Sequence, residues 1–198
     1  MPHIYNMNTD KPTHFDSLKD HFLLAMPGLN DPNFEHAVVY ICEHTENGAM
    51  GFIINHQLDI TAKAIFDQLD LKHDEETGRS LIFDGGPVQR DRGFILHRSS
   101  EQQWESTHEI SDGISLTASQ DILSEIAVGQ GPKNPLITLG YSGWGAGQLE
   151  EELAQNSWLT IPADAAIIFD TDCSQRAEAA AASIGLDLDM LSPDAGHA

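Results

Sequence analysis

Basic residues are scarce in this sequence. Its 198 residues include 10 Lys and Arg against 31 Asp and Glu, which gives a formal net charge of −21 at pH 7. Proteins that bind nucleic acids usually present a basic surface, because Lys and Arg displace the counterions of the phosphate backbone. An acidic surface repels that backbone, and it repels anionic membrane surfaces for the same reason. The composition therefore disfavours direct nucleic-acid binding and association with a membrane.

Long apolar runs and cysteines are scarce as well. No run reaches about 18 apolar residues, the length that crosses a bilayer. The chain starts with MPHIYNMNTD, which lacks the basic start and the apolar middle of a signal peptide. The two cysteines, Cys42 and Cys173, are too few for a disulfide framework. We therefore expect a cytoplasmic protein without a membrane span.

The sequence does contain enough apolar material for a core. Hydrophobic residues make up 40% of the chain, and its length suits one domain. Short apolar runs at 21–26, 36–44 and 49–56 predict strands, and Asn47-Gly48 predicts a hairpin turn between the last two. Further strands are expected from the apolar runs at 81–86, 93–98, 104–117, 135–141 and 158–162.

Helical patterns are interspersed with these strands. Four segments have the apolar spacing or the end signals of helices: 60–71, 117–129, 148–156 and 174–185. The second begins with the spacing of a capping box, from Thr117 to Gln120. Strands and helices are mixed without regular βαβ alternation, so the fold class is α+β. We expect a disordered extension over residues 1–17 and a single α+β domain over 18–198, with the last helix docked on it.

A glycine-rich loop lies within GYSGWGAGQLEEEL, residues 140–153. A Walker phosphate loop needs Lys and then Ser or Thr after its last glycine, but Gln148 follows Gly147 here. The glycine spacing is also one residue short of G-x-G-x-x-G. Three glutamates at 150–152 occupy the helix start, where they would repel a bound anion. The stretch therefore disfavours a nucleotide-phosphate site.

Two interpretations of this loop stay open. It could be a strand-to-helix turn in which the glycines let Trp144 pack against the backbone. It could also bind a neutral or cationic ligand through the polar and aromatic groups of Tyr141, Ser142, Trp144 and Gln148.

A second candidate segment is DGGPVQRDRGF, residues 84–94. This turn contains Arg90 and Arg92, and Arg98 follows just beyond it. Three of the ten basic residues therefore lie close together in this part of the sequence. In so acidic a protein it is the best anion site that the sequence offers, although the arginines could instead pair with surface acids. Because this turn and the 140–148 loop both follow strands, they could share one end of the sheet. A site between them would use Gly85, Gly86, Arg90 and Arg92 from the turn.

No catalytic or metal-binding pattern emerges from the sequence. The ten histidines form neither H-E-x-x-H nor a Cys/His cluster with zinc spacing. His36, His44 and His56 could converge, but ordinary hydrogen bonds at strand ends are the simpler interpretation. Ser142 lies two residues after Gly140, as in a G-x-S-x-G elbow, but Trp144 stands where the second glycine is needed. We expect no catalytic residues, no metal and no cofactor.

Five motifs in the same order resemble those of the YqgE/AlgH family of bacterial proteins. They are MPGLNDPNF, NGAMGFIIN, FDGGPV, LGYSGWGAGQLEEEL before WLTIPAD, and the closing GLDL…LSPDAGHA. The resemblance runs from about Leu18 to the C-terminus. It implies an α+β fold in which a bifurcated mixed β-sheet is rolled into a pseudo-barrel with flanking helices, and a cytosolic bacterial protein. The family is labelled as a transcriptional regulator through an association with alginate control, and it carries no agreed catalytic residues.

These observations lead to two hypotheses of function. The first is a non-enzymatic binding or regulatory module that acts through a protein partner, so that any control of transcription is indirect. The alternative is a small-molecule-binding protein or an enzyme with a site between the 84–94 turn and the 140–148 loop.

Overall fold

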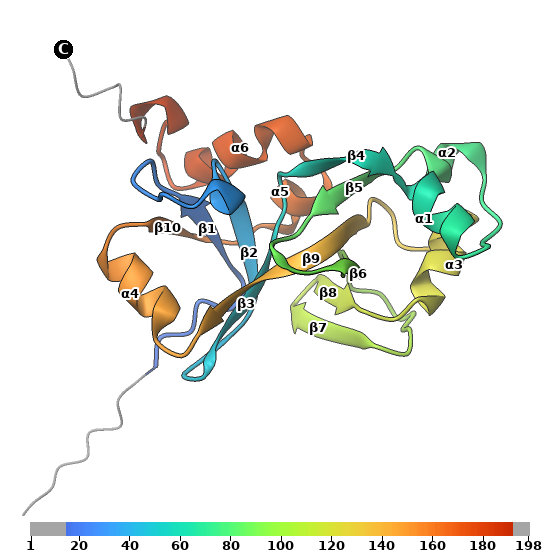
Figure 1. Cartoon of the computed structure of the whole chain (residues 1–198), viewed down its shortest axis with the longest axis horizontal. Coiled ribbons are helices and arrows are strands. Elements are labelled where there is room, and N and C mark those ends of the chain that lie inside the picture. The colour runs from blue at the N-terminus through green and yellow to red at the C-terminus, as the bar shows by residue number, and fades with distance from the viewer. Residues whose placement is uncertain (1–14, 192–198) are drawn as a thin grey trace, which may run out of the picture.

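The computed structural model describes residues 15–191 of the chain (Figure 1). Ten strands form one sheet in the order β10-β1-β2-β3-β9-β6-β8-β7, and β4 and β5 join it through β9. The strands are β1 His21–Ala25, β2 Val38–Thr45, β3 Gly48–Ile53, β4 Gln57–Thr61, β5 Leu81–Asp84, β6 Val88–Arg98, β7 Thr107–Ser111, β8 Ile114–Thr117, β9 Leu136–Gly145 and β10 Trp158–Pro162.

Helices lie on the outside of this curled sheet (Figure 1). α1, α2 and α3 cover one end, α4 covers the other, and α5 and α6 lie along one side. The α-helices are α1 Ala62–Gln68, α2 Glu75–Gly78, α3 Asp121–Ala127, α4 Gln148–Ala154, α5 Ala165–Phe169 and α6 Arg176–Ser183. Three short 3₁₀ turns complete the described chain: η1 Pro32–Phe34, η2 Cys173–Gln175 and η3 Leu188–Leu191.

Strand β9 is the point where the sheet divides. Its first half, around Ile137–Leu139, lies between parallel β5 and antiparallel β6. Its second half, from Ser142 to Gly145, pairs with β3 instead. Gly140 stands at the change of partner with a φ of +75°, a left-handed conformation that glycine adopts without steric cost. One strand therefore belongs to both halves of the sheet, which is what makes the sheet bifurcated.

Three apolar clusters fill the spaces that this division creates. The largest lies inside the curled sheet and includes Phe22, Tyr40 and Phe52, with residues of α5 and α6 packed on it. A second cluster lies between α1, α3 and the β5–β9–β6 part of the sheet. A third packs α4 against β1, β2 and β3. Each helix thus covers apolar side chains that a flat sheet would leave exposed.

The architecture confirms the α+β class and the bifurcated sheet rolled into a pseudo-barrel. The hairpin around Asn47 forms as expected, between β2 and β3. Among the helices between residues 15 and 191, none combines the length and apolar character needed to span a bilayer.

One predicted helix start was wrong, and another is shifted by two residues. The helix expected over 60–71 begins at Ala62, with Thr61 at its N-cap position, because residues 57–61 pair with β5 as a strand. The helix expected from Thr117 begins at Asp121. Thr117 is instead the buried last residue of β8, where its hydroxyl contacts His97. In both places long-range strand pairing overrides a local helix signal.

The two chain ends differ in detail from expectation. The predicted C-terminal helix over about 174–185 is divided into η2 and α6, which packs on the first cluster. The predicted N-terminal extension ends at residue 17, but contact with β2 already begins at Phe15, whose ring lies 4.8 Å from that of His44. Ser17 also donates a hydrogen bond to the His44 carbonyl. Residues 1–14 lie outside the described part of the chain.

One carboxylate of α4 binds two tryptophans of the sheet. The same oxygen of Glu152 accepts the indole N–H of Trp144 at 2.7 Å and that of Trp158 at 2.9 Å. The two tryptophans come from β9 and β10, on either side of α4 in the chain, and their rings meet edge to face with centroids 6.0 Å apart. A buried indole N–H needs an acceptor, and Glu152 supplies one for both rings.

Replacing Glu152 by Ala should therefore lower the free energy of unfolding by about 2–3 kcal/mol, since two indole donors lose a charged acceptor. Urea unfolding followed by tryptophan fluorescence measures this loss. Glu151→Ala is the matched control, because it removes the same charge from the same helix at an exposed position. We expect the control to change stability by less than about 0.5 kcal/mol, and equal losses in the two variants would contradict the role given to Glu152.

Candidate functional site

The two segments predicted to form a site do meet, by close packing of their backbones. A Cβ on Gly86 would overlap the Tyr141 carbonyl, and one on Gly140 would lie 2.5 Å from the Gly86 carbonyl oxygen. The Gly85 carbonyl oxygen accepts hydrogen bonds from the Ile53 N–H at 2.9 Å and from the buried Ser142 hydroxyl at 3.1 Å. This packing leaves no space for a ligand between the backbones at these glycines.

The other predicted residues of the 140–148 loop serve the fold. The Tyr141 ring packs edge-on against Phe94, with centroids 5.9 Å apart. Trp144 is buried in the third cluster with Phe34 stacked on it. The Gln148 side chain accepts the Gly145 N–H at 3.0 Å, at the turn into α4. The geometry therefore matches the strand-to-helix turn, one of the two interpretations of this loop.

The two predicted arginines point to different surroundings. Arg90 donates to the Asn33 side chain at 3.1 Å and lies 4.0 Å from an Asp84 carboxylate oxygen. The Arg92 guanidinium lies over the Phe94 ring, 5.1 Å from its centroid, and forms no ion pair with residues 15–191. Arg92 thus has no carboxylate partner among the described residues, and its guanidinium packs on a ring of the first cluster.

Arg92 borders a cavity of about 870 Å³ between α1, α3 and the strands β6 and β9. Its apolar lining consists of Ile60, Ala64, Ile65, Leu69, Ile95, Ala118, Leu123, Ile137 and Leu139. Its polar lining consists of Gln68, Gln89, Asp91, Arg92, Ser119 and Gln120. A concave, largely apolar space with a few polar groups at its edge is the usual form of a small-molecule site.

One residue of the cavity lining, Gly93, has no side chain to fill the space beside it. A Cβ at this position would meet nothing nearer than the Thr138 carbonyl oxygen at 4.0 Å. The Ser119 hydroxyl is not available to a ligand, because it donates to Asp121 and accepts the Ser106 N–H. The groups left to orient a ligand are therefore the glutamines, Asp91 and Arg92.

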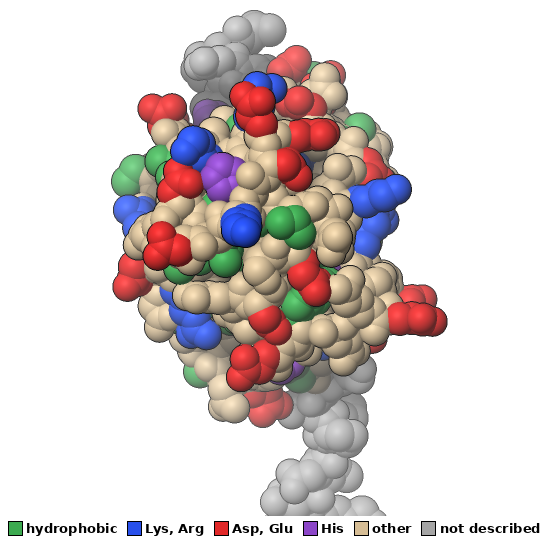
Figure 2. Space-filling view, turned by 90° about the vertical axis from the view of Figure 1, so that its right-hand side faces the viewer, with side chains coloured by type: hydrophobic (Ala, Val, Ile, Leu, Met, Phe, Trp, Pro, Cys, Tyr) green, Lys and Arg blue, Asp and Glu red, His purple; other side chains and the backbone are tan. Residues whose placement is uncertain are grey.

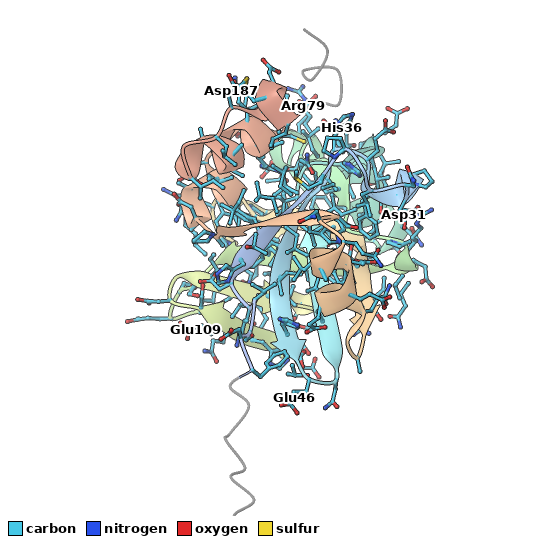
Figure 3. The ribbon with its side chains drawn as sticks, turned by 90° about the vertical axis from the view of Figure 1, so that its left-hand side faces the viewer. Asp31, His36, Glu46, Arg79, Glu109 and Asp187 are labelled. Carbon is cyan, nitrogen blue, oxygen red and sulfur yellow. The ribbon has the colours of Figure 1, made fainter. Side chains whose placement is uncertain are left out.

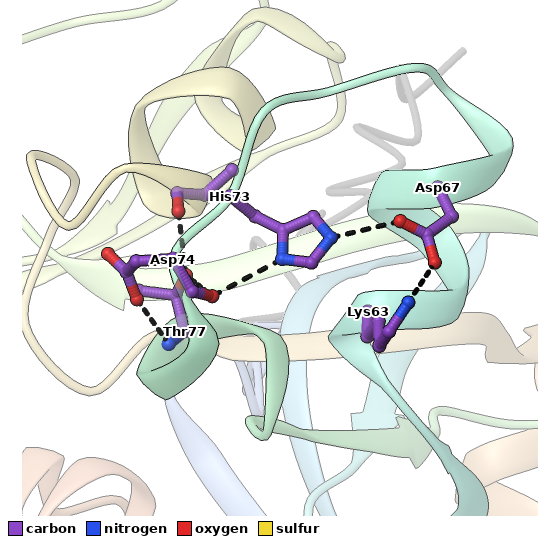
Figure 4. A network of polar contacts seen from close by, with 6 residues as sticks. Lys63, Asp67, His73, Asp74 and Thr77 are labelled. Carbon is purple, nitrogen blue, oxygen red and sulfur yellow. Dashed lines mark hydrogen bonds and ion pairs between the residues drawn. The ribbon is translucent and has the colours of Figure 1, made fainter.

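Helix α1 is fixed as a cavity wall by a polar network on its outer side (Figure 4). Asp67 accepts hydrogen bonds from Lys63 at 2.5 Å and from His73 Nε2 at 2.9 Å. His73 Nδ1 faces the Asp74 carbonyl oxygen at 3.2 Å, and Asp74 caps α2 through the Thr77 N–H. The Thr77 hydroxyl then donates to the carbonyl of Ala127 in α3 at 2.6 Å. The network thus joins α1 and α3, which border the cavity, through α2.

The charges in this network support one another. Both ring nitrogens of His73 face acceptors, so the hydrogen bond to the Asp67 carboxylate raises the pKa of the imidazole above its usual value. In return, Lys63 and then His73 hold the pKa of Asp67 below its usual range. Across the whole face that carries α1 and α3, acidic and basic side chains are interspersed, with hydrophobic side chains in small separate groups (Figure 2).

The histidines considered for a metal site do not converge. His44 Nδ1 accepts the Leu18 N–H at 2.8 Å, and its Nε2 donates to Glu150 at 2.7 Å. His56 Nε2 instead donates to the Glu35 carbonyl. No group of three or more possible metal ligands occurs among residues 15–191. These are the ordinary hydrogen bonds of strand ends.

Neither cysteine is placed to act as a nucleophile. Burial raises the pKa of the Cys42 thiol, which lies in the first cluster. Burial also raises the pKa of the Cys173 thiol, and Arg176 offsets that effect only in part. Both therefore remain protonated at neutral pH.

His97 is a buried titratable group next to the cavity, two residues along β6 from Ile95. Its Nδ1 donates to the Arg98 carbonyl at 2.9 Å, and its Nε2 accepts from the Thr117 hydroxyl at 2.8 Å. The Trp104 ring packs edge-on against it. Burial lowers the pKa of His97 below its usual value of 6.5, so folding disfavours the protonated imidazole.

Sequence reasoning identified Arg92 but missed the rest of the cavity lining. The apolar face of the 60–71 segment was visible, yet the sequence does not show that Ile65 and Leu69 border an open space. Gln89 and Gly93 gave no signal by themselves. They become neighbours of α1 and α3 only because β6 lies beside β9 in the sheet.

Comparison with known proteins agrees with this architecture. The AlgH-like family model matches residues 22–189. A UPF0301 protein of Thioalkalivibrio sulfidiphilus is 51% identical over 186 residues, which cover 94% of this chain and 100% of that protein. A UPF0301 protein of Saccharophagus degradans is 52% identical over 184 residues, covering 93% of this chain and 90% of the relative.

Two solved structures share the fold. The solution structure of the AlgH protein from Pseudomonas aeruginosa has a TM-score of 0.77 at 47% identity and covers 97% of this chain and 100% of its own. A crystal structure of a protein from Corynebacterium diphtheriae has a TM-score of 0.71 at 15% identity, with 90% and 93% of the two chains covered. The second likeness concerns the fold alone.

The close contact between Gly86 and the Tyr141 backbone leads to a testable prediction. Gly86→Ala should lower the free energy of unfolding by more than about 3 kcal/mol or prevent folding, because its Cβ would overlap the Tyr141 backbone at a φ of +148°. Soluble yield and urea unfolding measure the effect. Gly28→Ala is the control, since a Cβ there meets nothing within 4 Å. A Gly86→Ala protein with the wild-type urea midpoint would show that the close approach is not required.

The lowered pKa of His97 makes stability depend on pH. Below pH 6.5 the unfolded chain takes up a proton at this residue and the folded chain resists it, so stability falls as the pH falls. Compared with His97→Gln, the wild-type protein should lose up to about 1.4 kcal/mol more per pH unit below that point. Urea unfolding at several pH values between neutral and mildly acidic tests this, and parallel curves for the two proteins would refute it.

Proposed function

The chain belongs to the AlgH-like family, and we propose that it is a regulatory module that binds a small ligand and acts through a protein partner. The observation that carries the proposal is the cavity of about 870 Å³ between α1, α3, β6 and β9. Its lining offers binding contacts and no nucleophile placed beside a base, because the hydroxyl of Ser119 is engaged by Asp121 and Ser106.

The chemistry of the lining indicates the class of ligand. The nine apolar residues of the lining favour a ligand with an apolar body. Arg92 stands at the edge with no carboxylate partner among the described residues, so it favours an anionic group on that ligand. Neighbouring glutamines supply hydrogen bonds to its polar atoms. An amphipathic anion fits both parts of the lining.

The charge of the chain supports action through a protein rather than through DNA. A net charge of −21 opposes the phosphate backbone, whereas a protein surface of opposite charge is attracted to it. Control of transcription by such a module would be indirect.

Anilinonaphthalene sulfonate, which joins an apolar body to an anionic group, is a suitable probe of the cavity. The folded protein should bind it at one saturable site. Gly93→Leu should abolish binding by filling the cavity floor, and Arg92→Gln should weaken it about tenfold, or about 1.4 kcal/mol, by removing the cation. Fluorescence titration measures both, and far-UV circular dichroism shows that each variant is folded.

The neutral analogue phenylnaphthylamine provides the internal control. It has a similar apolar body without the sulfonate, so Gly93→Leu should abolish its binding while Arg92→Gln leaves it unchanged. Met26 lies in another groove, so Met26→Ser should change the binding of neither probe. If neither Gly93→Leu nor Arg92→Gln changes the affinity for anilinonaphthalene sulfonate, the proposed site is ruled out.

A further inference from the structure

A second hollow lies near β1 and belongs to none of the features above. It is a groove of about 700 Å³ between the loop that follows β1 and the 3₁₀ turn η3 near the end of the described chain. Its apolar lining is formed by Met26, Pro27, Leu29, Phe34, Leu188 and Leu191. The lining thus brings together two segments more than 150 residues apart in sequence.

One wall of the groove, the loop that follows β1, is anchored at several points. The Met26 N–H donates to the Ser157 carbonyl at 3.0 Å, and the Asp31 side chain caps η1 through the Asn33 N–H. The Phe34 ring is held by two tryptophans, 6.0 Å from Trp144 and 5.3 Å from Trp158, measured between ring centroids. An anchored wall lowers the entropic cost of binding a partner.

The rim of the groove is acidic. Asp31, Glu35 and Asp189 line it together with His36, whose Nε2 lies 3.8 Å from a Glu35 carboxylate oxygen, and its lining within residues 15–191 contains no Lys or Arg. Arg90 contacts this loop from outside the groove. Its guanidinium donates a hydrogen bond to the Asn33 side chain and lies near the Asp84 carboxylate. Figure 3 shows Asp187, Arg79 and His36 toward the top of the molecule and Asp31 on its right flank, whereas Glu109 and Glu46 lie toward the bottom. The apolar floor and the acidic rim therefore occur together in one place.

We infer that this groove docks an amphipathic segment of a partner protein that carries Lys or Arg beside its apolar face. The apolar side chains of the segment enter the groove, and its basic side chains meet the carboxylates of the rim. The inference rests on the partner-mediated part of the proposed function and is independent of what the cavity binds.

Charge favours this occupant over two others, a second copy of the chain and the chain's own C-terminal residues. A second copy of the chain brings its own net charge of −21 to an acidic rim. The chain beyond Leu191, SPDAGHA, contributes an aspartate and no Lys or Arg. Neither offers the positive charge that the rim would attract, and a basic amphipathic segment offers both the charge and the apolar surface.

The test uses a fluorescein-labelled peptide of Leu and Lys, about four helical turns long, with all leucines on one helical face. A second peptide has the same composition with the leucines distributed around the helix. Fluorescence anisotropy with the full-length protein at moderate salt should show saturable binding of the first peptide. The second peptide should bind at least about tenfold more weakly, because its charge is equal but its apolar face is lost.

Matched charge variants locate the site. Glu35→Gln with Asp189→Asn should weaken the amphipathic peptide about tenfold, since two rim carboxylates are neutralised. Glu46→Gln with Glu109→Gln removes the same charge at two positions that do not line the groove and should leave the affinity within about twofold. Met26→Ser should weaken the first peptide and not the second, because it changes the apolar lining alone.

Four results would overturn the inference. Equal affinity for the two peptides, or equal losses in the two charge variants, would mean that only overall charge is sensed. Binding that appears only after residues 192–198 are deleted would assign the groove to the chain's own terminus. A dimer in sedimentation experiments that Met26→Ser dissociates would assign it to a second copy. Intact binding of the sulfonate probe in the same samples would show that the cavity proposal is unaffected.

Discussion

The close approach of two backbones at Gly86 and Gly140 is the constraint on which the rest of the structure depends. It lies where β9 leaves its partners in one half of the sheet and joins β3 in the other. Any side chain on Gly86 would overlap the Tyr141 carbonyl, so the crossing is possible only with glycine. The Gly85 carbonyl then ties β3 and β9 together through Ile53 and Ser142. Because interiors are close-packed, a shift at this crossing would move both halves of the sheet.

The two proposed binding surfaces lie on opposite sides of that crossing. The half-sheet formed by β5, β6 and β9 supports the cavity, whose outer wall is α1 and whose helices are joined by the His73 network. The other half supports α4 and the groove, through the aromatic contacts of Phe34 with Trp144 and Trp158. Trp144 belongs to β9, the same strand that lines the cavity with Ile137 and Leu139. One strand thus provides a continuous covalent and hydrogen-bonded link between the two surfaces.

Much of the fold could be predicted from local patterns, and much of the candidate site could not. The strand at 21–26, the hairpin at Asn47-Gly48 and the helix after Gly147 follow from apolar spacing and turn residues, which act over a few positions. The helix start at Thr117 was wrong because that residue completes β8 and contacts His97 across the sheet. Of the predicted site residues, Arg92 borders the cavity, whereas Gly85, Gly86 and Ser142 pack the crossing. A glycine required for backbone packing and a glycine required for ligand access look the same in sequence.

The sequence by itself determined the family, the α+β class, the acidic surface and the turn chemistry, because motifs, composition and short-range spacing are properties of neighbouring residues. The tertiary structure decided which residues became neighbours. It placed Arg92 beside an apolar cavity and Arg90 beside Asn33, although the two arginines are only two positions apart. It also brought Leu188 and Leu191 to the loop that follows β1. These placements depend on strand order and helix packing, which arise from contacts between distant parts of the chain and leave no local pattern to read.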